Sequence, residues 1–175
     1  MPRAAEEDGL ERGTTYVENA VAKARYFAER TGMPSLADDS GLEVDALGGA
    51  PGPRSARFSL LERPGTPPAD VDAANNALLL ERLQGVPDER RTARYRCVVA
   101  YVETATQPPQ IVEAMCEGRI LTAPRGTDGF GYDPLFYSDE LHMTFAEAPA
   151  ATKHRVSHRG RAFRALIEVL LRHHQ

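Results

Sequence analysis

Residues 37–52, ADDSGLEVDALGGAPG, join two adjacent carboxylates and a small hydroxyl to a glycine-rich segment. Residues 35–37 before the carboxylates predict a short strand, and the alternation over 42–46 suggests another strand after them. Asp38-Asp39-Ser40-Gly41 is therefore predicted to be an exposed loop at the carboxyl end of a strand, where open α/β sheets commonly present ligand sites. Adjacent side chains of an extended chain face opposite ways, so at most one carboxylate points easily into a shared cleft, where it needs a cation as partner.

Helical periodicity lies on both sides of this stretch. Residues 16–31 carry apolar side chains at helical spacing and are preceded by a capping box of Thr15 and Glu18. The same spacing predicts helices over 69–83 and from Ser157 to near the C-terminus.

Alternating apolar and polar residues over 92–103 and 111–120 predict two further strands. The polar, proline-containing turn that separates them makes this pair antiparallel. Together with the strand before Asp38, the pair predicts a mixed sheet. The sequence shows no internal repeat and no linker-like segment, so we expect one α/β domain over 1–175, with helices flanking the sheet.

The composition narrows the classes of function. The 175 residues include 21 Lys+Arg and 25 Asp+Glu, and the net charge of -4 argues against broad nucleic-acid or acidic-membrane binding while leaving a small anionic substrate open. No uninterrupted apolar run approaches the ~20 residues of a membrane span, and a cytoplasmic location is expected. Cys97 and Cys116 lie far apart and outside any C-x-x-C pair, which predicts two buried free thiols.

Asp39 and Ser40 form the first candidate site. Asp39 could hold Mg²⁺, a hard cation that prefers carboxylate, water and phosphate oxygens, while Ser40 donates to a substrate. The alternative is a turn whose side chains bond to nearby backbone groups. Lys23 shares a helix face with Asn19 and could point toward the same site, or it could be an ordinary exposed lysine.

Two later segments form the other candidates. In 129–134, GFGYDP, two glycines permit a tight loop from which Phe130 or Tyr132 could stack on a nucleobase, and Asp133 adds a carboxylate; the alternative is a loop closed by a buried aromatic plug. In 153–160, KHRVSHRG, cations at a helix start favour a phosphate or nucleobase, and the alternative is a solvated basic face.

Four motifs in order carry a resemblance to a known family. They are T-x-x-E-N-A-x-x-K-A (15–24), ADDSGLEVDALGGAPGPRSAR (37–57), GFGYDPLF (129–136) and SHRGRA (157–162). From about residue 14 to the C-terminus, the chain resembles the inosine triphosphate pyrophosphatase family. The resemblance implies an elongated mixed sheet with two lobes around a central substrate cleft, a homodimer, and Mg²⁺-dependent hydrolysis of ITP, dITP or XTP to the monophosphate and pyrophosphate, which cleanses the nucleotide pool.

The resemblance also implies the role of each matching residue. Asp39 matches the catalytic residue that binds metal and is proposed as base, and Ser40 matches its substrate-contacting neighbour. Glu11 matches a second acidic metal residue. The other matches, to substrate-binding residues, are Lys23 for phosphate, Phe130, Gly131, Tyr132 and Asp133 for the nucleotide loop, Lys153 for the substrate, and His158 with Arg159 for the base.

The base-reading pair has a physical rationale. A 6-oxo purine needs donors facing its oxygen, and the side chains of His158 and Arg159 are rich in donors. The amino group of adenine would leave those donors facing another donor, which predicts selection against adenine nucleotides.

One departure from the family concerns the start of the chain. The family begins with a strand and a T/S-x-N-x-x-K loop, and neither has a match before Thr14. We therefore expect a chain that is N-terminally incomplete relative to the family and less active than a version extended upstream. The alternatives are a catalytically weak nucleotide-binding or dimer-forming relative, and a pyrophosphatase directed at other modified or pyrimidine nucleotides.

Overall fold

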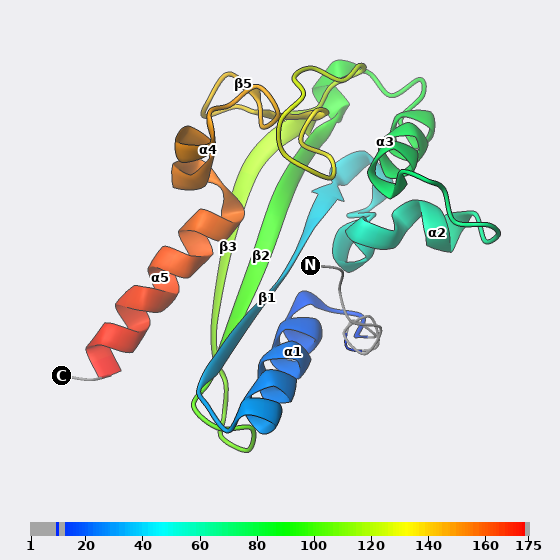
Figure 1. Cartoon of the computed structure of the whole chain (residues 1–175). Coiled ribbons are helices and arrows are strands. Elements are labelled where there is room, and N and C mark those ends of the chain that lie inside the picture. The colour runs from blue at the N-terminus through cyan, green and yellow to red at the C-terminus, as the bar shows by residue number, and fades with distance from the viewer. Residues whose placement is uncertain (1–9, 11–12, 174–175) are drawn as a thin grey trace. The chain divides into compact units, whose positions relative to one another are not determined.

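The computed structural model describes residues 10 and 13–173 of the chain (Figure 1). The helices are α1 (Tyr16–Thr31), η1 (Asp45–Leu47), η2 (Gly52–Arg57), α2 (Phe58–Glu62), α3 (Val71–Arg82), η3 (Asp88–Arg90), α4 (Ala150–Val156) and α5 (His158–His173), of which the three named η are 3-10 helices. The strands are β1 (Ser35–Val44), β2 (Thr92–Val102), β3 (Gln110–Ile120), β4 (Phe136–Ser138) and β5 (Met143–Thr144), and they form one sheet in that order. The predicted α/β class is confirmed.

The first helix begins and ends where the sequence predicts. The Thr15 hydroxyl accepts a hydrogen bond from the Glu18 amide over 3.2 Å, and the Glu18 carboxylate accepts one from the Thr15 amide over 3.1 Å. This reciprocal capping box satisfies amides that the helix itself leaves unpaired. Gly32, at φ 65°, ends the helix in the left-handed conformation that glycine adopts at little cost.

The segment around the two carboxylates differs from its prediction. It is not a loop between two strands, because β1 runs without interruption from Ser35 to Val44. Leu42 and Val44 are fully buried and hold the second half of the strand in the core. This packing outweighs the turn preference of Asp38-Asp39-Ser40-Gly41. Asp38 and Asp39 therefore lie in the middle of a strand.

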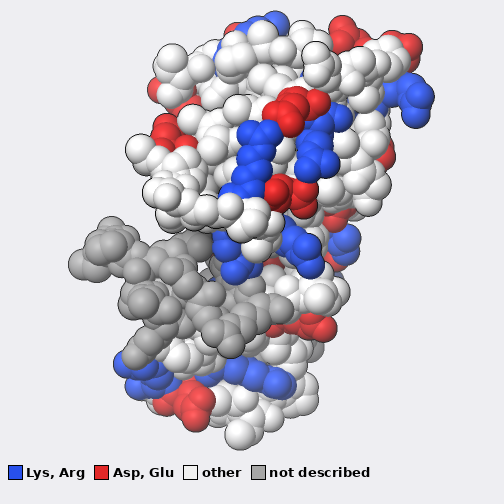
Figure 2. Space-filling view, turned by 90° about the vertical axis from the view of Figure 1, so that its right-hand side faces the viewer, with Lys and Arg blue, Asp and Glu red and all other residues white. Residues whose placement is uncertain are grey.

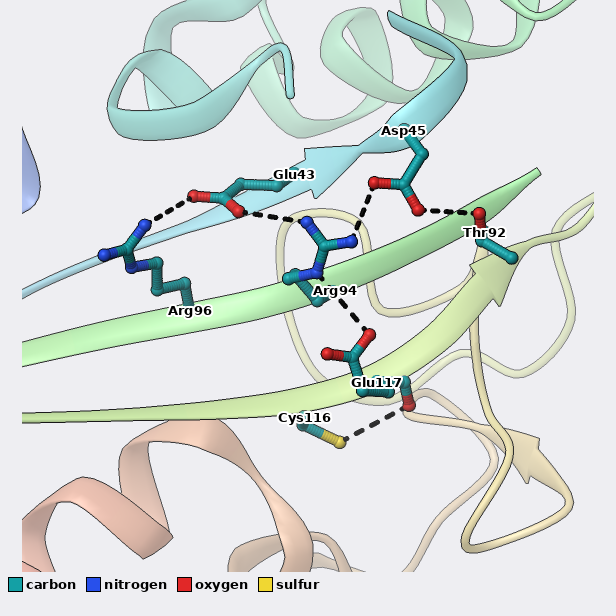
Figure 3. Close-up of polar contacts among 7 residues, drawn as sticks. All are labelled: Glu43, Asp45, Thr92, Arg94, Arg96, Cys116 and Glu117. Carbon is teal, nitrogen blue, oxygen red and sulfur yellow. Dashed lines mark hydrogen bonds and ion pairs between the residues drawn. The ribbon is translucent and has the colours of Figure 1, made fainter. Parts of the chain in front are cut away.

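The sheet was predicted to be mixed, and its described pairs are antiparallel. β3 pairs with β4 through Gly118 and Ser138, and β4 pairs with β5 in the same sense. Figure 3 shows β1 and β2 running in opposite directions. The connection between them leaves β1 and enters β2 at the same end of the sheet, where the Thr92 hydroxyl donates to Asp45 over 2.7 Å. A connection that returns at the same end makes the two strands antiparallel.

Contacts between residues divide the chain into two compact units. The first unit comprises Met1–Ser40, Cys97–Ala114 and His158–Gln175, and the second comprises Gly41–Arg96 and Met115–Ser157.

In the first unit, helices cover both faces of the strand segments (Figure 1). The even-numbered residues of 98–102 on β2 pack with the alanines of α1 on one face. Cys97 and Val99 pack with Ala162 and Leu166 of α5 on the other face. The alternation of a strand thus divides the apolar residues of β2 between two helices.

The core of the second unit is rich in aromatic side chains. The rings of Tyr95, Phe136 and Phe145 pack on one another, with centroids 4.7, 4.9 and 5.8 Å apart. Leu79 of α3 and Leu83 after it are fully buried in the same cluster. Ring pairs of this kind contribute about 0.5–1.5 kcal/mol beyond the area they bury.

A network of charged side chains ties three strands of the second unit together (Figure 3). Arg94 of β2 lies 2.7 Å from Asp45, 3.5 Å from Glu43 of β1 and 3.5 Å from Glu117 of β3. Arg96 reaches the other oxygen of Glu43 over 3.4 Å. Because the same arginine contacts both neighbouring strands, the network favours one register of the sheet.

The surface carries charges of both signs. On the face drawn in Figure 2, Lys and Arg side chains lie beside Asp and Glu side chains. Two exposed pairs of this kind join the region of α2 to α3: Arg82 with Glu62, at 2.6 Å, and Arg63 with Glu81, at 2.5 Å. Exposed pairs contribute little to stability, about 0–1 kcal/mol each.

The cysteines and the helices test two further expectations. Cys97 and Cys116 are free and buried, as predicted. Among the described residues, no helix combines the length and the apolarity that crossing a membrane requires.

Candidate active site

Asp39 is held by two side chains of α1. Its side chain lies on the face of β1 that packs against this helix, and the residue is 6% exposed. Asn19 donates from Nδ2 to Asp39 Oδ2 over 3.0 Å, and Lys23 donates from Nζ to Asp39 Oδ1 over 3.2 Å. A buried carboxylate needs such partners, because burying a charge without them costs on the order of several kcal/mol. Lys23 is thus the cation that was expected beside one of the two adjacent carboxylates, and that carboxylate is Asp39.

The local structure explains this arrangement. Asn19 and Lys23 are one helical turn apart and therefore point the same way. Ala20 and Ala24, both fully buried, let α1 pack closely against the sheet. Asn19 Oδ1 also accepts from the Gly13 amide over 2.8 Å, which fixes the orientation of the Asn19 amide group. A Cβ at Gly13 would lie 2.7 Å from Asn19 Oδ1, so glycine is required for this approach.

Asp38 faces the opposite side of β1, as the alternation of a strand predicts. Its Oδ1 accepts from Arg159 over 2.9 Å, and its Oδ2 accepts from the Ser40 hydroxyl over 3.0 Å. The Cys97 thiol lies 3.9 Å from the same Oδ2. Burial raises the pKa of Cys97 to about 12, with the Asp38 charge as a smaller cause. The Cys97 sulfur is therefore a neutral thiol at physiological pH.

The loop before β4 presents one aromatic ring and buries another. Phe130 is 66% exposed, whereas Tyr132 is 3% exposed and donates from its hydroxyl to the Ser55 carbonyl over 2.8 Å. Burial raises the pKa of Tyr132, so this hydroxyl stays a donor. Of the two predicted stacking residues, Phe130 is the exposed ring and Tyr132 is the buried plug.

Asp133 organises the same loop. Its Oδ2 accepts from the Phe130 amide over 2.9 Å and forms an ion pair with Lys153 of α4. Lys153 Nζ also lies 5.1 Å from the centre of the Phe130 ring, within cation–π range. Gly129 has φ 83°, and a Cβ there would collide with the Asp133 carboxylate. The glycine before Phe130 is therefore required for this arrangement.

The third predicted segment is divided between two helices. Lys153 belongs to α4, while His158 and Arg159 begin α5. His158 is buried, and Arg159 is exposed and paired with Asp38. The sequence did not predict α2 or α4, because helices of 5 and 7 residues give too short a periodic pattern.

The structure gathers the predicted residues into two groups, one in each unit. The first-unit group is divided between the two faces of β1: Lys23 and Asp39 meet on the α1 face, whereas Ser40 and Arg159 contact Asp38 on the opposite face. His158 precedes Arg159 at the start of α5. The second-unit group contains Phe130, Gly131, Tyr132, Asp133 and Lys153. Glu11, predicted as a second metal ligand, lies outside the described residues. The sequence did not assign a role to Asn19, although its position one turn before Lys23 puts the two side chains on the same face of the helix.

The motifs behind these two groups agree with a known family. Residues 2–169 match the Ham1 family over most of the chain. The chain belongs to the Ham1 family. This membership confirms the resemblance that the four sequence motifs indicate.

Individual members of the family resemble this chain in sequence and in structure. It is 50% identical over 167 residues to a dITP/XTP pyrophosphatase of Thioalkalivibrio sulfidiphilus, covering 95% of this chain and 80% of that protein. It is 47% identical over 165 residues to a dITP/XTP pyrophosphatase of Yersinia pestis, covering 94% and 80%. A HAM1 protein of Coxiella burnetii has a similar structure, with a TM-score of 0.83 and 40% identity over 95% of this chain and 84% of that one.

Proposed function

We propose that this chain hydrolyses dITP, XTP and ITP to the monophosphate and pyrophosphate and so removes non-standard purines from the nucleotide pool. Its similarity to proteins named dITP/XTP pyrophosphatase supports the reaction class. The observation that carries the proposal is the buried Asp39 carboxylate, held by Asn19 and Lys23 on a strand face.

The first-unit group has the chemistry that phosphoryl transfer needs. Attack of water on a phosphorus atom requires an oriented water molecule and neutralised phosphate charge. In the proposal, Asp39 orients the water and accepts its proton, and Lys23 contributes positive charge to the phosphates. Asn19 keeps the Asp39 carboxylate in one orientation through its 3.0 Å hydrogen bond.

Magnesium belongs to the proposal as a cofactor. Within the described part of the chain, no group of three or more His, Cys, Asp or Glu side chains could hold a metal ion by itself. A single carboxylate fits Mg²⁺ nevertheless, because this ion usually takes one or two protein carboxylates and completes its shell with water and substrate phosphates. Asp39 would be that ligand, and the ion would supply further charge neutralisation for the phosphates.

The second-unit group has the chemistry of nucleotide recognition. The exposed Phe130 ring is suited to stacking on a base, a contact worth about 1–3 kcal/mol. Lys153, 19% exposed and adjacent to that ring, is suited to a phosphate or a base oxygen.

The base-reading pair belongs to the first unit and is a separate part of the proposal. We propose that His158 and Arg159 supply donors that read a 6-oxo group, which would distinguish hypoxanthine and xanthine from adenine.

Steady-state kinetics with a panel of nucleotides tests the proposal. The measurement compares kcat/KM for dITP, XTP and ITP with kcat/KM for dATP and dCTP, with Mg²⁺ and after its removal by a chelator. We expect preferences for the first three of up to about 10⁴-fold, since a mismatched base leaves donors unpaired. Equal kcat/KM for dITP and dATP would contradict the base-reading assignment, and chelator-resistant turnover would contradict the role of Mg²⁺.

The family resemblance also implies a cytoplasmic homodimer, which we include in the proposal. Light scattering coupled to size-exclusion chromatography tests the dimer. A mass of a single 19.2 kDa chain across the working concentration range would contradict it.

A further inference from the structure

We infer that Asp72 and Asn76 of α3 are positioning residues for the loop that carries Phe130 and thus for binding of the nucleobase. The inference rests on the proposed function. Both side chains act on the peptide groups of one residue, Gly131. The Gly131 amide donates to Asp72 Oδ2 over 2.7 Å, and Asn76 donates from Nδ2 to the Gly131 carbonyl over 2.7 Å.

The geometry of α3 makes this double contact possible. Asp72 and Asn76 are one helical turn apart and lie on the same face. Asn76 Nδ2 also donates to the Asp72 carbonyl over 2.9 Å, so the amide group of Asn76 is fixed by two acceptors. Asn76 Oδ1 is buried and makes no hydrogen bond within the described residues. The orientation of Asn76 is therefore set by its donors.

The contact fixes the loop next to the exposed ring. Gly131 has φ 61°, a conformation that few residues other than glycine adopt readily. Gly131 follows Phe130 in the chain, and the amide of Phe130 itself donates to Asp133 Oδ2. The backbone is thus anchored on both sides of Phe130 while the ring itself stays exposed. An ordered loop loses less conformational entropy when a base binds, which strengthens binding.

A helix-capping role does not explain these side chains. Asp72 lies in the first turn of α3, where the helix dipole by itself already favours an acidic residue. The N-cap of α3 is Asp70, whose Oδ1 accepts from the Ala73 amide over 2.9 Å. Asp72 and Asn76 each bind a residue far along the chain, 59 and 55 positions away, although Asn76 also donates to the Asp72 carbonyl of its own helix.

The direction of each hydrogen bond suggests isosteric variants that differ in how much they weaken the anchoring of the loop. Asp72→Asn retains an oxygen that can accept from the Gly131 amide. It is therefore expected to weaken the anchoring of this amide less than Asp72→Ala does. Asn76→Asp removes the donor and places a carboxylate against the Gly131 carbonyl, which is repulsive. Asp70→Ala is the matched control, because it removes the cap of the same helix without contacting the loop.

Two measurements on the full chain with Mg²⁺ test the inference. Hydrogen exchange by NMR is expected to show faster exchange of the Gly131 amide in Asp72→Ala than in Asp72→Asn or Asp70→Ala. Calorimetry is expected to show dIMP binding weakened about tenfold in Asn76→Asp, as a lost hydrogen bond with added repulsion predicts, with pyrophosphate binding unchanged.

The outcomes separate this inference from the proposed function. Unchanged exchange at Gly131 in Asp72→Ala, or equal weakening of dIMP binding by Asn76→Asp and Asp70→Ala, would overturn the positioning role. Failure of the unaltered protein to hydrolyse dITP would overturn the proposed function instead, and exchange at Gly131 would still decide whether α3 holds the loop.

Discussion

Asn19 Nδ2 lies 3.0 Å from Asp39 Oδ2, and both residues are buried. An amide donor stabilises the charged form of a carboxylate without adding a charge of its own. Together with Lys23 on the other oxygen, it gives Asp39 a fixed orientation in a strand that is otherwise packed.

Asn19→Asp is expected to make stability depend on pH in a new way. Two carboxylates about 3 Å apart share a proton, because their repulsion raises the pKa of one of them. A raised folded-state pKa gives stability that is complete below the unfolded pKa and is lost as pH rises through the folded value. Urea unfolding is therefore expected to show that the variant loses about 2 kcal/mol relative to the unaltered protein between about pH 5 and about pH 8.

Asn19→Ser controls for the removal of the Asn19 amide without added charge. Because this variant adds no second carboxylate, its stability is expected to fall less steeply than that of Asn19→Asp between about pH 5 and about pH 8. Parallel curves for Asn19→Asp and Asn19→Ser would contradict the close approach of Asn19 to Asp39.

Asp39→Asn is expected to reduce kcat for dITP by at least about 100-fold, because the substitution removes the charge that orients water and binds the metal. The side chain keeps its size, so circular dichroism and the cooperative unfolding transition are expected to persist. Asp38→Asn is the matched control one residue away on the opposite face of β1 and is expected to cost less activity. Turnover in Asp39→Asn equal to that of the unaltered protein, at saturating Mg²⁺, would rule out this role.

The sequence predicted the frame of the first-unit group but not its details. The capping box and the glycine stop define α1 through local interactions, which a sequence displays directly. The burial of Asn19 depends on a contact with a residue 20 positions away, and a helix surface asparagine gives no local sign of it. The continuity of β1 likewise depends on the burial of Leu42 and Val44 in the core.

The second-unit loop shows the same limit. The glycines and aromatics of 129–134 predicted a tight loop, but could not say which ring is exposed. That choice depends on the Ser55 carbonyl, 77 positions from Tyr132, which accepts the Tyr132 hydroxyl. The short helix α4, which carries Lys153, is stabilised by tertiary contacts instead of by a periodic pattern of its own.

Phe130→Ala and Tyr132→Phe are expected to separate binding from stability. Phe130 is 66% exposed, so its removal is expected to raise KM for dITP about tenfold, as the loss of one stacked base predicts, with little change in the free energy of unfolding. Tyr132→Phe removes one buried hydrogen bond and is expected to destabilise the fold by about 1 kcal/mol with KM little changed. Kinetics and urea unfolding of both variants provide the measurement, and a reversal of the two effects would contradict the assignment of ring and plug.

Cys97 is expected to make the protein sensitive to alkali. Burial raises the pKa of Cys97 from 9.0 to about 12, so the unfolded chain loses this proton at lower pH than the folded chain does. Stability from this thiol is complete below the unfolded pKa and is lost as pH rises from about 9 to about 12. The free energy of unfolding of Cys97→Ala is expected to fall less steeply over that range. Equal slopes for both proteins would mean that Cys97 is not buried as a neutral thiol.

The identity of the products tests the central claim most directly. Phosphorus NMR of dITP incubated with the full chain and Mg²⁺ follows the α-phosphorus and the released phosphate species in one experiment. Attack at the α-phosphorus by the water that Asp39 orients predicts dIMP and pyrophosphate in equal amounts from the first turnovers, with both products formed at least about 100-fold more slowly by Asp39→Asn. Release of orthophosphate with dIDP would contradict the proposed reaction, because it would place the attack at the terminal phosphorus.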